Sequence, residues 1–222
     1  MLNSTRPRID DRNSPTDEDG VAAGMLLRVH LVDGSVHAFT QADEATARKI
    51  WQSLDPVRLF AQQRVVIAGT YSKSVFVCAE IVRIDFLLPS CACWEFPQGY
   101  SDVVELSEAD FRKHAHLDQP ELMPKREQCT PAGDLLVSFL ELHLRGCPPI
   151  FLMTEFSVKL PLENQWFMRF LLSKTGFHMR IRGGGVGVVN LAHLAGYTVY
   201  PGVPEVPSDA WPAEPALSVP PQ

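Results

Sequence analysis

Apolar and polar residues alternate near the start of the chain, where Leu27, Val29 and Leu31 are separated by Arg28 and His30. A period of two residues is typical of a β-strand with one buried face. An Asp-Gly pair follows soon after and predicts a tight hairpin turn. We therefore expect the folded part of the chain to begin with a β-hairpin.

The residues that follow predict the second strand of this hairpin, then a helix and two more strands. The second strand covers residues 36–40, and Thr40 is placed to cap the helix, with Asp43 three residues further on. Trp51 lies on the apolar face of the predicted helix. The two strands after the helix are predicted at residues 64–69 and 75–86.

The same order of patterns recurs later in the chain at a constant offset of 113 residues. Residues 27–31 resemble residues 140–144, and residues 75–81 resemble residues 188–194. Between these anchors, each copy has a second apolar run, a helix-like stretch with a tryptophan, and another strand-like run. An internal repeat decides how the whole fold is interpreted, and we infer two degenerate ββαββ units.

The second unit, at residues 134–200, has different turn residues from the first unit, at residues 24–90. A strand over residues 135–145 ends in a Gly-Cys-Pro-Pro turn. Pro161 suits the first turn of the predicted helix. Three consecutive glycines at 183–185 then separate the last two predicted strands.

These patterns predict an α+β fold in which the two repeats form a pseudo-symmetric, mostly antiparallel sheet body. Residues 91–133 are predicted to be an acidic linker with a short helix over 107–116, capped by Ser107. Residues 1–23 are polar and predict a disordered acidic arm. Residues 201–222 hold seven prolines and predict an extended, proline-rich tail.

Composition restricts the classes of partner and compartment. The net charge is −6, and the isoelectric point is near 5.6. This charge argues against duplex nucleic acid as the main partner, because such binding depends on neutralising phosphates. Five cysteines in 222 residues are an odd and sparse set, whereas disulfide frameworks use dense, even sets, so we do not expect such a framework. With neither a signal-like start nor a long apolar stretch, we expect a cytoplasmic protein that does not enter the membrane.

One cluster of residues could bind zinc. Cys91, Cys93, His114 and His116 carry ligand types that close a tetrahedral structural site. The two histidines fall on a predicted helix, however, where residues two apart point about 200° away from each other. Reduced structural cysteines and surface histidines are therefore the alternative interpretation.

A basic run is the second candidate, since Lys174, His178, Arg180 and Arg182 lead into glycines at 183–185. Glycines let a backbone approach phosphate, and arginines bind it with two donors. A phosphate loop needs a helix after its glycines, whereas here a strand is predicted. A flexible hairpin turn beside exposed basic residues is the alternative.

The predicted repeat also suggests a paired site. His30 and His143 occupy equivalent positions on the first strand of each copy and could form a symmetric ligand-binding or proton-transfer site. The alternative is that both are half-exposed strand residues. Neither has a carboxylate or nucleophile close to it in the sequence pattern that would specify catalysis.

Three functional classes follow from these observations. We expect a non-enzymatic binding or assembly module that uses strand edges or faces to contact another protein or a second copy of itself. The first alternative is a nucleic-acid-binding accessory protein that uses the basic strand of the second repeat. The second alternative is an enzyme with a site between the repeats.

Overall fold

The computed structural model describes residues 24–88, 103–122, 135–157, 174–200, 208–211 and 213. The predicted N-terminal arm and the second predicted helix, near Pro161, lie outside these residues. Of the proline-rich tail only a few residues are described, among them Trp211, which is exposed. None of the described helices is long and apolar enough to cross a membrane.

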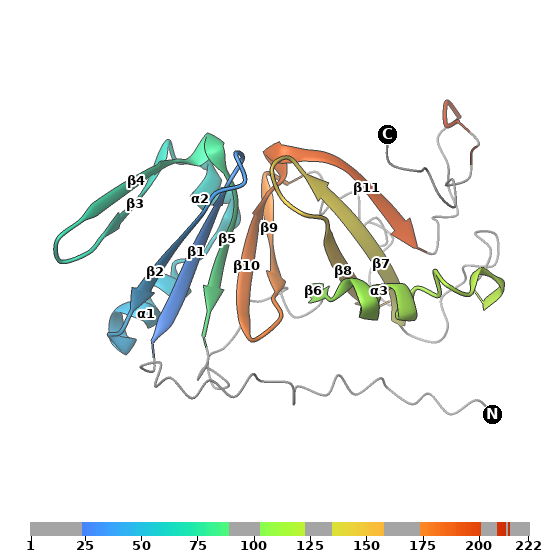
Figure 1. The fold of residues 1–222 in the computed structure, drawn as a ribbon, viewed down its shortest axis with the longest axis horizontal. Helices are drawn as coiled ribbons and strands as arrows, with labels where there is room; N and C mark the ends of the chain where they lie inside the picture. The colour runs from blue at the N-terminus through green and yellow to red at the C-terminus, as the bar shows by residue number, and fades with distance from the viewer. Residues whose placement is uncertain are drawn as a thin grey trace.

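The fold is mixed α+β and is built on one large sheet of nine described strands, which confirms the predicted class (Figure 1). The strand order is β11-β7-β8-β6-β9-β10-β5-β1-β2, and all pairs are antiparallel except β6 with β9. Strands β3 and β4 form a separate two-stranded sheet. The strands are β1 (Met25–Leu31), β2 (Val36–Gln41), β3 (Arg64–Ala68), β4 (Lys73–Val77), β5 (Ile81–Leu87), β6 (Val103–Leu106), β7 (Leu135–Leu144), β8 (Ile150–Ser157), β9 (Gly176–Arg180), β10 (Gly185–Asn190) and β11 (Leu194–Tyr200).

Two capped helices follow β2. Helix α1 (Glu44–Gln52) begins after Asp43, whose side chain accepts a hydrogen bond from the Thr46 backbone N–H at 2.7 Å. The prediction that Thr40 caps this helix was therefore wrong, because Thr40 still belongs to β2. A second helix, α2 (Pro56–Ala61), begins directly at the proline, since proline fits the first turn and Asp55 caps it.

The predicted strand over 75–86 is divided in two. A 3-10 turn at Cys78–Glu80 separates β4 from β5, so the chain leaves the small sheet and enters the large one. The second half contains the same feature, a 3-10 turn at Leu191–His193 that leads into β11. The sequence pattern missed β11, because its apolar residues do not alternate regularly.

The predicted linker contributes a strand to the middle of the large sheet. Strand β6 pairs with β8 along four residues and touches β9 through the pair Val104–Arg180. Helix α3 (Glu108–His114) follows, and its cap is confirmed, since Ser107 Oγ accepts a hydrogen bond from the Asp110 backbone N–H at 3.0 Å. A short 3-10 turn at Pro120–Leu122 comes after it. The interpretation of this region as a connection had no strand.

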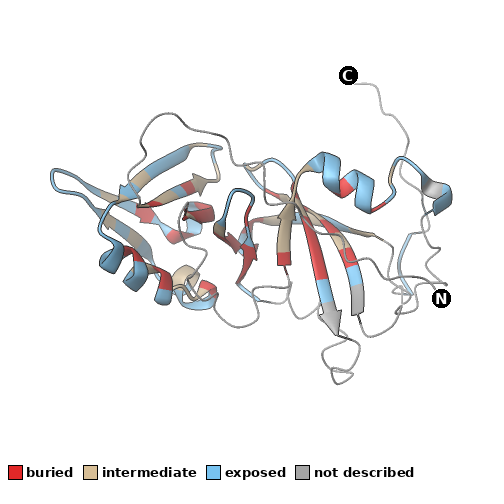
Figure 2. Cartoon of the chain, turned by 90° about the horizontal axis from the view of Figure 1, so that it is seen from below, coloured by how far each residue is buried: buried red, intermediate tan, exposed pale blue. Residues whose placement is uncertain are grey.

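Two apolar cores lie along the sheet, and the buried residues are found mainly on its strands (Figure 2). The first core contains Trp51 from α1 and Ile84 from β5, and the second contains Leu142 from β7 and Met179 from β9. Strand β10 serves both, because Val188 faces the first core while its neighbour Val189 faces the second. The predicted burial of Trp51 is confirmed, with 4% of it exposed.

The two halves, residues 24–88 and 135–200, meet in two places. Strand β10 of the second half pairs with β5 of the first half, which makes the sheet continuous. The β7–β8 turn also touches the β1–β2 turn, because a Cβ added to Gly146 would lie 1.9 Å from the Val32 carbonyl oxygen. The sequence left open whether the halves share one sheet, and they do.

Candidate functional site

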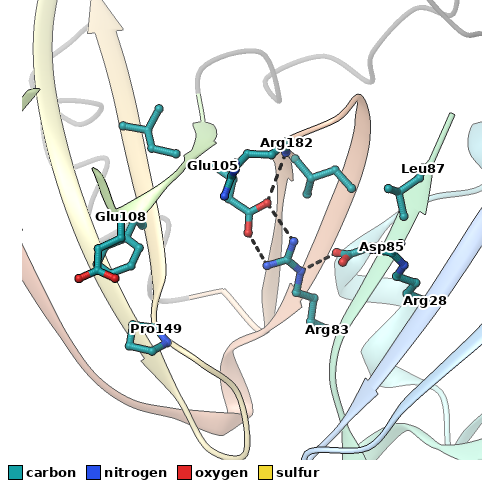
Figure 3. Close-up of a pocket in the computed structure, with 11 residues that line it drawn as sticks. Arg28, Arg83, Asp85, Leu87, Glu105, Glu108, Pro149 and Arg182 are labelled. Carbon is teal, nitrogen blue, oxygen red and sulfur yellow. Dashed lines mark hydrogen bonds and ion pairs between the residues drawn. The ribbon is translucent and has the colours of Figure 1, made fainter. Parts of the chain in front are cut away.

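A cavity of about 350 Å³ lies where β5, β6 and the end of β9 come together (Figure 3). Its lining is mixed in charge, with three arginines and three carboxylates among mostly apolar neighbours. The lining residues are Arg28, Arg83, Asp85, Leu87, Glu105, Leu106, Glu108, Pro149, Phe151, Ile181 and Arg182.

Arg83 is the centre of this site and is nearly buried, with 9% exposed. Its two terminal nitrogens, Nη1 and Nη2, donate to Oε1 and Oε2 of Glu105 at 2.6 and 3.0 Å. Its Nε donates to Asp85 Oδ1 at 2.5 Å, and Figure 3 shows the guanidinium lying between the two carboxylates. A planar fork matched to a carboxylate in this way is a strong, charge-assisted contact. It ties β6 to β5 across the two intervening strands.

Strand alternation explains why two charged residues stand inside a buried strand. Ile84 and Phe86 face the first core, so Arg83 and Asp85 face the opposite side of β5. Gly187 of β10 lies directly opposite Asp85 in the sheet. A Cβ at Gly187 would lie 3.1 Å from Asp85 Oδ1, so the glycine leaves room for the carboxylate.

Asp85 also receives a hydrogen bond from His30 Nε2, at 3.0 Å. Burial favours a higher pKa for Asp85, but the hydrogen bond from His30 and the adjacent Arg83 outweigh it, so its pKa lies below the ordinary value. Burial acts in the opposite sense on Arg83, whose pKa is nevertheless raised by Glu105 and Asp85. The buried part of the site is thus a network of compensated charges.

The charged groups that a ligand could contact lie at the rim of the cavity. Arg28, Glu108 and Arg182 are exposed there, while Arg83, Asp85 and Glu105 are already paired with one another. The Arg182 backbone N–H is 3.4 Å from Glu105 Oε2, which attaches the end of β9 to the network. The arrangement favours holding strands together over activating a reacting group.

The two histidines of the predicted paired site have separate surroundings. His30 lies against Asp85, and His143 lies 3.4 Å from Glu141 Oε1 on its own strand. Neither lines the cavity. The sequence pattern had given neither histidine a carboxylate partner; each has one, and the carboxylate beside His30 comes from a strand 55 residues away.

The basic run is divided among different surroundings. Lys174 precedes β9 and Arg180 is its last residue, and both are exposed, whereas His178 within β9 is buried. Arg182 lies in the turn beyond the strand and lines the cavity. The structure therefore brings Arg182 to the site and places Lys174 and Arg180 outside its lining.

Half of the zinc hypothesis lies outside the described residues, since Cys91 and Cys93 are not among them. His114 ends α3, and its ring stacks on Phe139 with 6.4 Å between centroids. His116 follows with a left-handed backbone, φ 55°. Within the described ranges, no group of three or more histidine, cysteine, aspartate or glutamate residues is placed to hold a metal.

Open strand edges are the second notable surface. Among the described strands, β4 pairs only with β3, and β11 pairs only with β7. Val75 and Val77 on β4 are 48% and 54% exposed, and Tyr197 on β11 is 49% exposed. An unpaired edge with exposed apolar side chains is a template for another strand.

Comparison with known proteins adds no assignment, because no family, curated protein or solved structure matches this chain.

Sequence reasoning missed Arg83, Asp85 and Glu105 as site residues. The signal present was the pair of charged positions within an otherwise apolar strand, Ile81–Leu87. A buried strand tolerates such charges only when they are paired. Their partner Glu105 could not be identified from the sequence, because it lies in the region interpreted as a linker.

Proposed function

We propose that this protein is a non-enzymatic binding and assembly module that captures protein strands at its open sheet edges. The observation that carries this proposal is that strands β4 and β11, each paired on one side only among the described strands, hold the exposed residues Val75 and Tyr197. Strand addition uses backbone hydrogen bonds for affinity and exposed side chains for specificity. Location in the cytoplasm stays part of the proposal.

The proposal includes the internal duplication that the sequence pattern predicts. Three observations support it. The 3-10 turns at Cys78–Glu80 and Leu191–His193 begin 113 residues apart. The strands that follow them, β5 and β11, have seven residues each. In both halves, the first strand pairs with the second and with the last. A doubled unit offers similar edges twice.

The charged cavity supports the same proposal from the other side. Its buried carboxylates are neutralised by Arg83, so its strongest contacts are used within the fold. This is the pattern of a polar network that fixes how elements are positioned. The network thus ties β6, in the connection between the halves, to β5 of the first half, and it helps to keep the sheet and its edges in place.

The proposal is tested by recovering the tagged full-length protein from its source cell and measuring the native mass of its complex. We expect a mass well above the 24.7 kDa of one chain. Val75→Lys and Tyr197→Lys should release the bound chains, because a charge on an edge strand discourages pairing. Val57→Lys is the matched control, since Val57 is 48% exposed but lies in helix α2 and not on a strand.

Two outcomes would overturn this assignment: recovery of the wild-type protein as a single chain, or a complex that none of the edge variants changes. The nucleic-acid hypothesis makes a different prediction. Binding to single-stranded or duplex nucleic acid should then weaken steeply with salt and depend on Arg180 and Arg182. The carboxylate of Glu105 beside the Arg182 backbone disfavours a phosphate at that position.

A further inference from the structure

The two halves are joined by pairing of β5 with β10. Under the predicted repeat, β11 is the equivalent of β5 and β4 is the equivalent of β10, and neither has such a partner among the described strands. Strand β5 has two neighbours, β1 and β10, whereas β11 has β7 alone among the described strands. Strand β10 likewise has β9 and β5, whereas β4 has only β3 within the same described part. The open side of β11 therefore lacks a strand of the β10 kind, and the open side of β4 lacks a strand of the β5 kind, so each of these two strands could serve as the other's partner.

The offset of the predicted repeat turns this observation into a specific register. In the chain, Val188 of β10 lies directly opposite Ile84 of β5. Moving Val188 back by 113 residues gives Val75 on β4, and moving Ile84 forward by 113 residues gives Tyr197 on β11. The same shift places Ser74 opposite Thr198.

Burial distinguishes the filled contact from the unfilled one. Val188 and Ile84 are 0% and 2% exposed, whereas Val75 and Tyr197 are 48% and 49% exposed. Apolar side chains whose counterparts are buried within the chain are thus left accessible at both free edges. Aromatic and β-branched residues directly across two strands form a stabilising pair.

We propose that the partner at these edges is a second copy of this chain, with β4 of one molecule adding to β11 of the next. This inference rests on the proposed function and names its partner. One molecule does not make the contact with itself, because β4 lies at the left end of the molecule and β11 lies in its right half (Figure 1). Each copy therefore uses β4 toward one neighbour and β11 toward another, which is a head-to-tail interface that builds a ring or a filament.

The composition of the two edges agrees with pairing. Strand β11 runs for seven residues without a proline or a charged side chain, and β4 carries only Lys73. Natural edge strands that stay unpaired usually carry charges, proline or a bulge to prevent association. The bulge in β11 lies at its start, near Leu194–Gly196, and leaves the following residues regular.

Single cysteines in two separate samples of the purified full-length protein test the register. Ser74→Cys and Thr198→Cys should cross-link when the two variants are mixed under mild oxidation, because opposite residues lie about 5 Å apart. Neither variant should cross-link with itself above the background of the wild type, whose native cysteines set that background. Ser74→Cys mixed with Gly196→Cys is the control shifted by two residues, a separation of about 7–8 Å that strains a disulfide. Gly196 has open space for a side chain.

Light scattering on the same purified protein gives a second readout. The wild type should have a mass that is a multiple of 24.7 kDa, Val75→Lys and Tyr197→Lys should be single chains, and Val57→Lys should match the wild type. A cross-link of Thr198→Cys with itself would overturn the head-to-tail interface in favour of a symmetric one. A wild type that is monomeric and forms no cross-link would overturn self-association. If its complex from the source cell still depended on Val75 and Tyr197, strand capture would stand with a different partner.

Discussion

In each half of this protein, the first strand pairs with the second and with the last, and the halves differ in how β6 pairs with them. In the second half, β6 lies between β8 and β9 and makes their sheet continuous. In the first half, no described strand bridges β2 and β3, and the β3–β4 hairpin forms its own small sheet. The β9–β10 hairpin thus joins the main sheet on both sides, through β6 and through β5, whereas the β3–β4 hairpin has neither kind of contact among the described strands.

The halves also differ in how they use charge. Strand β5 carries Arg83 and Asp85, whereas β11 carries Gly196 and Thr198 at positions 113 residues later. Only β5 faces a carboxylate from β6, since Glu105 reaches Arg83 from there. The comparison teaches that β6 and the buried network belong together, because a buried arginine is tolerated when a carboxylate meets it.

The largest expected effect tests whether this network holds β6 to the first half. Arg83→Ala leaves Asp85 and Glu105 without their cation in a poorly hydrated place. Removing one partner of a buried ion pair costs about 3–5 kcal/mol, and we expect that loss in the free energy of unfolding. Denaturant titration followed by circular dichroism measures it.

The matched control for that experiment is Arg112→Ala. Arg112 also forms an ion pair, with Asp118, but both side chains are largely exposed. Exposed pairs contribute little, so the free energy of unfolding should stay close to that of the wild type. Equal losses for Arg83→Ala and Arg112→Ala would mean that the network does not hold β6 to the first half.

A second, smaller effect concerns pH and the contact of α2 with β9. His178 is 1% exposed, and burial lowers its pKa from 6.5 to about 4, with Lys174 adding to the shift and Asp55 opposing it. The unfolded chain therefore binds a proton more readily than the folded one. Stability should fall as the pH drops from 6.5 toward 4, by about 3 kcal/mol at most.

Removing the imidazole should remove this pH dependence. The variant His178→Gln should show a flatter free energy of unfolding than the wild type across that pH window. Met179→Leu is the control, because this buried neighbour of His178 on β9 leaves the imidazole in place and should keep the wild-type slope. Parallel curves for His178→Gln and the wild type would contradict the buried, neutral histidine. Asp85, whose pKa is lowered, acts only at more acidic pH.

The last prediction compares two turn glycines, of which one is needed for its backbone conformation alone and the other also for a contact between the halves. Gly34 and Gly146 lie in the two hairpin turns with φ of 84° and 71°. Alanine in a left-handed conformation costs about 1–2 kcal/mol at either position. Gly146→Ala should cost more than Gly34→Ala, because its Cβ would meet the Val32 carbonyl, whereas the Cβ at Gly34 would be 3.7 Å from the Gly146 oxygen. Equal decreases in the thermal stability of the two variants would show that the two turns are not in contact.

Much of the fold was predictable from local patterns. The alternation of Leu27, Val29 and Leu31 gave a strand, and the glycines at 183–185 gave the turn between β9 and β10. Errors occurred where a local signal had two readings. Thr40 and Asp43 are both helix-capping types, and only the length of β2 decided between them. The run over 75–86 looked continuous, because its 3-10 turn is itself flanked by apolar residues.

The candidate site was much less predictable than the fold. Its two carboxylates lie in different parts of the chain, and Asp85 and Glu105 meet only through Arg83. A sequence pattern records which face a residue points to, but not which distant strand will be laid beside it. The sequence also did not show which strands are at the edge of a sheet, because an edge strand and a strand with two neighbours can have the same local composition.

The sequence by itself determined the first strand, the cap of α3 and the turn between β9 and β10, because alternation, capping residues and glycine turns act over a few neighbouring positions. Tertiary structure alone decided that β6 enters the middle of the sheet, that β10 pairs with β5, and that Arg83 is paired. These choices join residues tens of positions apart, and each depends on the combined burial and hydrogen bonding of the whole sheet. The total burial and hydrogen bonding of the sheet cannot be read from any short stretch of residues.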